Sequence, residues 1–192
     1  MFYMIYLATG LSSRYGSNKL LEEIDGKPMY RHLLDILTVM KEEEPHRYEL
    51  VVVTAYDEIE NDLQGLPLKI VRNRNQELGA SHSIKLGLEA CGEIGRHDHV
   101  MFAVADQPYV QEDELFGFIH MFKRSYKGLG VLCWQGEMGN PVIFQGKFVP
   151  ELLALTGDVG GKTVVREHLS EVFQYEADSE MSLRDIDTPQ ES

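Results

Sequence analysis

The sequence predicts an α/β protein in which helices cover a mostly parallel sheet. Short apolar runs alternate with amphipathic segments of helical period almost from one end of the chain to the other. The runs at 50–54 and 100–105 are continuously apolar, which is typical of strands buried on both faces of a parallel sheet. With 192 residues, 43% of them hydrophobic, the chain is long enough for one well-packed core, and we expect a single domain over 1–192.

Strands are expected where a short apolar run ends at polar or turn-forming residues. They span 2–8, 50–54, 68–71, 100–105, 130–134, 141–144 and 172–175, with a turn at 136–140 between the fifth and the sixth strand.

Helices are expected between these strands. The first begins near Pro28, because proline suits the first turn of a helix, and it ends at the acidic run before Pro45. Ser81 or Ser83 is expected to cap the third helix. The other helices are expected at 57–63, 81–91, 112–126, 148–155 and 163–169.

Composition and charge limit the possible functions. The chain has 18 Lys and Arg against 31 Asp and Glu, and the net charge of −13 disfavours binding to nucleic acid or to an acidic membrane surface. An anionic substrate therefore needs a local positive cradle or a metal ion. The sequence has no basic leader and no long apolar segment, so we expect a cytoplasmic protein without a membrane span. Cys91 and Cys133 form no C-x-x-C pair and are expected to be small buried residues.

Residues 9–19, directly after the first expected strand, have the composition of a phosphate-binding loop. Gly10 and Gly16 let the backbone approach phosphate oxygens, and Arg14 and Lys19 can neutralise phosphate charge. No G-x-G occurs here, which argues against the dinucleotide-binding signature.

Asp106 follows the expected strand at 100–105, and the carboxyl ends of parallel strands meet at one edge of a sheet. We therefore expect Asp106 to lie near residues 9–19, where its carboxylate could hold a Mg²⁺ ion that bridges phosphate oxygens. The alternative is that Asp106 only caps the turn before Pro108.

A second acidic pair lies near the end of the sequence. Asp185 and Asp187 are two residues apart on an extended segment, so they point the same way and one of them could complete the metal site. A solvated turn before Pro189 explains the pair equally well.

Two further polar segments are candidates for substrate contacts. Residues 73–83 contain Gly79 and open a helix, and they could read a base or ribose or form an ordinary capping loop. Residues 157–163 are similar to a P-loop, but three residues rather than four separate the outer glycines and a helical segment precedes them. We interpret them as a loop near the second substrate, where Lys162 could meet an anion.

Together these residues resemble the nucleotidyltransferases of molybdenum-cofactor maturation, in particular the cytidylyltransferase branch, which is related to the guanylyltransferases. Residues 7–19 read LATGLSSRYGSNK, which is similar to the family signature L-A-[AG]-G-x-S-x-R-[MF]-G-x-x-K. Thr9 and Tyr15 depart from that signature. Four further segments fall in the family's order: Asn75 with GASHS at 79–83, ADQP at 105–108, GNP at 139–141 followed by GDVGG at 157–161, and DIDTP at 185–189.

The resemblance implies a Rossmann-like three-layer domain of the nucleotide-diphospho-sugar transferase type, with a sheet of about seven strands, one of them antiparallel. The implied reaction joins CMP from CTP to the phosphate of the molybdenum-pterin cofactor and releases pyrophosphate. The product would serve a molybdenum hydroxylase, which would be a transient partner. The alternatives are transfer to a sugar phosphate or another small phosphorylated alcohol, and a carrier that binds the cofactor without catalysis.

The resemblance also implies roles for individual residues. The nucleotide would be bound by Leu7, Ala8, Thr9, Gly10, Ser12, Ser13, Gly16, Lys19, Asn75, Gly79, Ala80, Ser81, Ser83 and Asp106. The catalytic residues would be Lys19, Arg14 and Asp106, with Mg²⁺ on Asp106 and Asp187 and a weaker phosphate contact from Lys27. The acceptor would meet Gly139, Asn140, Gly157, Asp158, Gly160 and Gly161.

Overall fold

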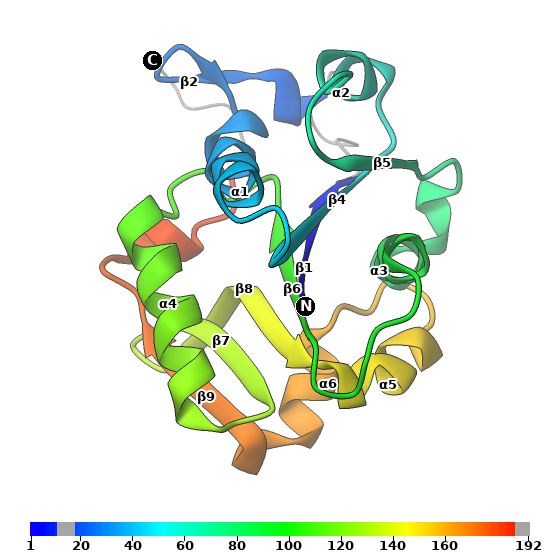
Figure 1. The fold of residues 1–192 in the computed structure, drawn as a ribbon. Coiled ribbons are helices and arrows are strands. Elements are labelled where there is room, and N and C mark those ends of the chain that lie inside the picture. Colours follow the sequence, from blue (N-terminus) through cyan, green and yellow to red (C-terminus); the bar gives the residue numbers. More distant parts are fainter. Residues whose placement is uncertain (11–17, 187–192) are drawn as a thin grey trace.

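A seven-stranded sheet forms the centre of the computed structural model, which describes residues 1–10 and 18–186 (Figure 1). The strands follow the order β5-β4-β1-β6-β8-β7-β9. Their bounds are β1 (Phe2–Ala8), β4 (Tyr48–Thr54), β5 (Lys69–Arg72), β6 (His99–Val104), β7 (Leu129–Trp134), β8 (Glu137–Gln145) and β9 (Val172–Glu176). Only β8 runs antiparallel to its two neighbours in this sheet. The predicted α/β class and mostly parallel sheet are confirmed.

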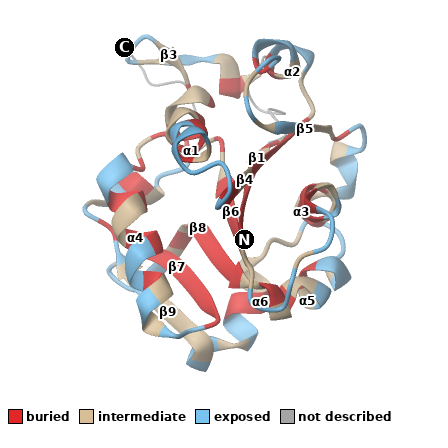
Figure 2. Ribbon diagram, viewed as in Figure 1, coloured by how far each residue is buried: buried red, intermediate tan, exposed pale blue. Residues whose placement is uncertain are grey.

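Helices cover both faces of the sheet, so the protein has three layers (Figures 1 and 2). Alternate side chains of each buried strand point to opposite faces. One cluster of buried residues joins the sheet to α1 (Arg31–Glu43), α2 (Asp57–Asp62) and α4 (Glu112–Ser125). The other joins it to α3 (Ala80–Cys91), α5 (Val149–Ala154) and α6 (Lys162–Glu167).

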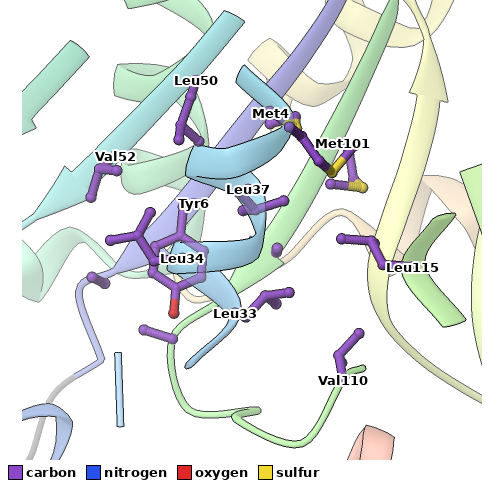
Figure 3. Packing of buried hydrophobic residues seen from close by; sticks show 14 of the residues in the cluster. Met4, Tyr6, Leu33, Leu34, Leu37, Leu50, Val52, Met101, Val110 and Leu115 are labelled. Atoms are coloured by element: carbon purple, nitrogen blue, oxygen red, sulfur yellow. The ribbon is translucent and has the colours of Figure 1, made fainter. Parts of the chain in front are cut away.

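The packing of α1 shows how the sequence pattern produces this arrangement. Leu33, Leu34 and Leu37 recur at helical spacing, and all three are buried against β1 and β4 (Figure 3). Tyr6 of β1 lies beneath them, and its hydroxyl donates to the carbonyl of Tyr30 at 2.8 Å. Burial of these apolar side chains fixes the helix over the sheet.

Short elements complete the chain. A two-stranded hairpin is formed by β2 (Glu23–Ile24) and β3 (Lys27–Pro28). The 3-10 helices are η1 (Lys19–Leu21), η2 (Gln76–Leu78), η3 (Gly146–Phe148), η4 (Leu169–Glu171) and η5 (Glu180–Leu183). No helix in the described ranges is long and apolar enough to cross a membrane. Cys91 and Cys133 are both buried, as expected.

Three local predictions are wrong. Pro28 does not begin a helix, because Asp25 and Gly26 both have positive φ and form a tight turn that pairs Pro28 with Glu23. The helix predicted there begins at Arg31 instead.

Neither serine caps α3, since Gly79 occupies the N-cap position without a side-chain hydrogen bond. The turn expected at 136–140 is shorter, because Glu137 already pairs with Trp134 and begins β8.

The sheet topology brings the candidate residues to one edge. β1 and β6 are parallel neighbours in which Leu7 pairs with Val104, so Gly10 and Asp106 leave adjacent strands at the same edge. Because β8 is reversed, its first residues reach this edge as well. Asn140 therefore lies at the carboxyl edge of the sheet, close in space to the end of β6.

Candidate active site

Two large hollows that contain candidate residues lie at the carboxyl edge of the sheet. The polar hollow, about 440 Å³, is lined by Thr9, Gly10, Lys19, Gln76, Glu77, Gly79, Ala80, Ser83, Asp106 and Asp158. The apolar hollow, about 410 Å³, is lined by Leu7, Ala80, Ile84, Phe102, Val104, Asn140, Val142, Phe144 and residues 158–163 with Arg166. A third hollow of about 140 Å³ shares Gly10 and Asp106 with the first, and Leu7 and Val104 with the second. The three form one crevice.

Lys19 and Asp106 form an ion pair in the polar hollow. The ammonium of Lys19 lies 3.0 Å from Oδ2 of Asp106, and their side chains are 7% and 25% exposed. η1 supplies Lys19 and the turn after β6 supplies Asp106. Desolvation of the Lys19 charge is offset by the carboxylate, while an exposed part of Asp106 faces the hollow. Burial, and secondarily the charge of Asp106, raises the pKa of Tyr6 below this edge.

The start of the predicted phosphate loop is anchored from three sides. The hydroxyl of Tyr56 donates to the Gly10 carbonyl at 2.5 Å, and Nε2 of Gln76 donates to the Thr9 carbonyl at 3.2 Å. Oγ1 of Thr9 lies 2.9 Å from Oγ of Ser83, which also accepts from Nδ2 of Asn73 at 3.0 Å. These contacts tie the end of β1 to α3 and to the end of β5.

The predicted nucleotide and acceptor segments touch each other at Gly79. This glycine has φ +81°, and a Cβ built on it would lie 2.7 Å from the backbone of Asp158. Oδ1 of Asp158 accepts from the backbone N–H of Ala80 at 3.2 Å. The hydroxyl of Ser81 donates to the Gly157 carbonyl at 2.7 Å. Glycine is required at 79 by both the backbone conformation and the close approach of the second loop.

The C-terminal segment is fastened to the turn that carries Asp106. Nε2 of the buried Gln107 donates to the Leu183 carbonyl at 3.0 Å and to Oδ1 of Asp185 at 2.7 Å. The backbone N–H of Ile186 donates to the Asp106 carbonyl at 3.0 Å. The structure thus places Asp185 beside the turn that carries Asp106.

Most of the predicted site residues that the structure describes line the crevice. Those are Leu7, Thr9, Gly10, Lys19, Gly79, Ala80, Ser83, Asp106, Asn140, Asp158, Gly160 and Gly161. Ser12, Ser13, Arg14, Gly16 and Asp187 lie outside the described residues.

Other predicted residues lie beside or away from the hollows. Ala8 is fully buried, and the Ser81 hydroxyl is directed to Gly157. Gly139 packs against Leu183, whose Cδ2 would lie 2.3 Å from an added Cβ. Asn75 is exposed and lines none of the hollows described above.

Lys27, the weaker phosphate candidate, lies on the β2–β3 hairpin. Its ammonium is 2.8 Å from Oδ2 of Asp35, and its side chain is 45% exposed. It lines neither large hollow.

Sequence reasoning included Asn73 and Gln76 in the polar segment 73–83 without giving either a role, and it missed Arg166. Asn73 follows β5, so the same strand-end argument that found Asp106 would have found it. Arg166 lies four residues after Lys162 on α6, which is the spacing of neighbours on one helix face. No local pattern distinguishes Gln76.

Asp106 lines this crevice together with Glu77 and Asp158, and Gln107 holds Asp185 beside the turn that carries Asp106. Hard cations prefer carboxylate oxygens, so the Asp106 and Asp185 carboxylates could hold a divalent cation here. Glu151, Glu167 and His168 form another acidic group, with ligand atoms within 4.8 Å of one another. That group lines neither large hollow. It is therefore separate from the site built around Asp106.

Comparison with known proteins assigns the chain to a family. The MobA-like NTP transferase domain matches residues 4–172. The chain belongs to this family. As a MobA-like NTP transferase it is a nucleotidyltransferase, and a nucleoside triphosphate is its substrate.

Individual relatives agree with the MobA-like assignment. The purine catabolism protein PucB of Bacillus subtilis (strain 168) is 25% identical over 197 residues, which covers 97% of this chain and 92% of PucB. A nucleotidyl transferase from Methanothermobacter superposes with a TM-score of 0.75 at 20% identity, over 97% of this chain and 92% of that one. Rv0371c from Mycobacterium tuberculosis H37Rv gives a TM-score of 0.74 at 19% identity, over 97% and 93%. At these identities the two structures show the shared fold.

Proposed function

We propose that this MobA-like protein transfers CMP from CTP to the phosphate of the molybdenum-pterin cofactor, with Mg²⁺ as cofactor and pyrophosphate as the second product. The observation that carries this proposal is the Lys19–Asp106 pair in the polar hollow, 3.0 Å apart, at the point where β1 and β6 end. Nucleotidyl transfer needs in-line positioning and neutralisation of phosphate charge more than covalent help from the protein. The Lys19 cation can neutralise phosphate charge, and the Asp106 carboxylate can hold a divalent cation that positions the triphosphate.

Each residue has a part in the reaction. A phosphate oxygen of the acceptor attacks the α-phosphorus of the nucleotide, and the bond to the leaving pyrophosphate breaks. The Lys19 ammonium has three donors, so it can keep its bond to Asp106 while it binds a phosphate oxygen. The segment 9–19 would wrap the triphosphate, and Gly79 with Ser83 would contact the base or ribose.

The donor set fits a divalent cation. Asp106 presents a partly exposed carboxylate to the polar hollow, and Gln107 holds Asp185 beside the same turn. Mg²⁺ bound there would neutralise the phosphate charge that develops during transfer. Rv0371c, which shares the fold, has been solved as a complex with manganese. Asp187 remains the predicted second ligand, and it lies outside the described residues.

The test combines purified protein and Mg²⁺ with each nucleoside triphosphate in turn, and with either the molybdenum-pterin cofactor or a panel of sugar phosphates. Pyrophosphate release is measured and the product mass is determined. We expect release only with CTP and the pterin cofactor, and a product heavier by one CMP. Asp106→Asn, which keeps the shape of the side chain, should lower the rate at least about 100-fold.

Other outcomes contradict specific parts of the proposal. A guanylated product would replace CTP by GTP and leave the mechanism intact. Release with a sugar phosphate alone would replace the acceptor. Tight cofactor binding without any pyrophosphate release would contradict the transfer reaction and favour the carrier.

A further inference from the structure

We propose that Lys162 and Arg166 bind the phosphate of the acceptor, and that the apolar hollow they line selects an acceptor whose phosphate is attached to an apolar or aromatic body rather than to a polyol. This inference rests on the proposed transfer reaction and names the binding site of its second substrate. It adds Arg166, and the selection by the hollow's walls, to the loop at 157–163 in which the sequence already suggested that Lys162 meets an anion.

The two cations are paired with nothing in the described part of the chain. They lie four residues apart on α6 and both line the apolar hollow. Neither side chain makes a hydrogen bond or ion pair with any residue within 1–10 or 18–186. By contrast, Lys19 is paired with Asp106, and Arg72 with Asp57 at 2.7 Å. In a chain of net charge −13, two adjacent cations that form no ion pair within the described residues indicate a place for an anion.

The electrostatics of Lys162 support this. Burial is the main cause that lowers the pKa of Lys162; the charge of Asp185 raises it in part, and the nearby Arg166 lowers it by a smaller amount. An anion between the two cations would remove their mutual repulsion and stabilise both charged forms. A phosphate group suits this arrangement, because it offers several acceptor oxygens to a guanidinium fork and an ammonium.

The position also suits an acceptor that must reach the nucleotide. Asp185 connects the two sides of the crevice, since it accepts from Gln107 next to Asp106 and its charge acts on Lys162. The small hollow bounded by Leu7 and Val104 joins the apolar hollow to the polar one. A phosphate held at α6 is therefore on the same crevice as the catalytic pair.

The walls of the apolar hollow determine what the phosphate can be attached to. Ile84, Phe102, Val142 and Phe144 line it from α3, β6 and β8. A polyol placed against these side chains would lose hydrogen bonds to water without replacement, which is costly. A flat aromatic or apolar body would lose none and would gain contact with the two phenylalanine rings.

The test measures binding directly and does not depend on turnover. Phenyl phosphate and glucose 1-phosphate are titrated by calorimetry into the wild-type chain, Lys162→Met, Arg166→Gln and the control Arg124→Gln. Arg124 is an exposed cation on α4 that lines neither large hollow. We expect phenyl phosphate to bind the wild type at least about ten-fold more tightly than glucose 1-phosphate, because the polyol must be desolvated. Each α6 variant should weaken phenyl phosphate binding about ten-fold or more, and Arg124→Gln should not.

Measuring nucleotide binding to the same proteins distinguishes failure of this inference from failure of the proposed function. CTP with Mg²⁺ should bind all four proteins alike, because the polar hollow is unchanged. Equal phenyl phosphate affinity in all four proteins would overturn the assignment of the phosphate to α6, and tighter binding of glucose 1-phosphate would overturn the selection by the walls. If no acceptor causes pyrophosphate release, the transfer reaction is contradicted. The measured phenyl phosphate affinities still decide where the phosphate binds.

Discussion

Gln107 donates a 2.7 Å hydrogen bond to the carboxylate of Asp185, across 78 residues of sequence. The same amide nitrogen donates to the Leu183 carbonyl, so one buried side chain fixes the C-terminal segment beside Asp106.

Replacing Gln107 by Leu should therefore lower the free energy of unfolding by about 1–3 kcal/mol, because the carbonyl and the carboxylate lose their partner. Hydrogen exchange should increase at 183–186 in particular. Urea titration and mass-resolved exchange measure both effects. Gln64→Leu is the matched control, since Gln64 is exposed and bonds only within its own turn, and it should change stability by less than about 0.5 kcal/mol. Unchanged exchange at 183–186 would contradict the fastening role.

Lys19→Met should reduce kcat at least about 100-fold, because it removes the cation fixed beside Asp106. The fold should persist, since the remaining carboxylate is partly exposed and can be hydrated. Steady-state pyrophosphate release and circular dichroism check the two expectations. Lys127→Met removes an exposed lysine whose ammonium donates to the Ser170 carbonyl, and a comparable loss there would show that the effect is general charge loss.

Gly79→Ala should destabilise the protein by about 2–4 kcal/mol, through the positive φ and the collision with the Asp158 backbone together. Gly65→Ala separates the two causes, because Gly65 has φ +86° but open space around its Cβ position. That variant should lose only about 1 kcal/mol. Equal losses in thermal or urea unfolding would mean that the contact between the two loops contributes nothing.

Acid should destabilise the protein through His99. Burial first, then the charges of Lys123 and the N-terminal amine, lowers the pKa of His99 below its ordinary value of 6.5. The unfolded chain consequently binds the proton at a higher pH than the folded chain, so the free energy of unfolding falls as the pH decreases below about 6.5.

The variant His99→Phe keeps the ring contacts with Phe2 and Phe122 and should flatten this decline. Urea titrations at pH 7.5, 6 and 5 measure it. His97→Gln, at an exposed position two residues away, should keep the wild-type decline. If both variants decline like the wild type, the acid sensitivity arises elsewhere.

The two thiols should be inert in the folded protein. Burial raises the pKa of Cys91 to about 12, and burial with the carboxylate of Glu176 raises that of Cys133 to about 11. The thiolate is the reactive form, so a thiol reagent at pH 8 should modify neither residue until urea is added. Rapid modification of either thiol without denaturant would show that the burial is incomplete in solution.

Much of the fold follows from local sequence. Continuous apolar runs predicted the strands, and the ends of β1 and β6 brought Gly10 and Asp106 together because adjacent parallel strands share an edge. The errors occurred where the same local sequence is compatible with two different secondary structures. Pro28 fits a first helical turn as well as a hairpin, and only the positive φ of Asp25 and Gly26 selects the hairpin.

In the candidate site, the sequence predicted which residues lie together only where they follow the ends of adjacent strands. The contact of Gly79 with Asp158 and the bond of Gln107 to Asp185 join segments more than 70 residues apart, and neither segment carries a local signal of its partner. Such contacts come from packing of the whole domain.

The position of the antiparallel strand β8 late in the chain determines when the crevice forms during folding. The strands β5, β4, β1 and β6 all lie within the first 104 residues, whereas Asn140 and residues 158–163 belong to the part of the chain that follows. A nascent chain that ends before β8 has one wall of the crevice and an unpaired β6 edge, which is open to wrong partners. The apolar hollow therefore forms only after β8 has docked onto that edge, and competence for a reaction that uses both hollows would report completed assembly of the sheet.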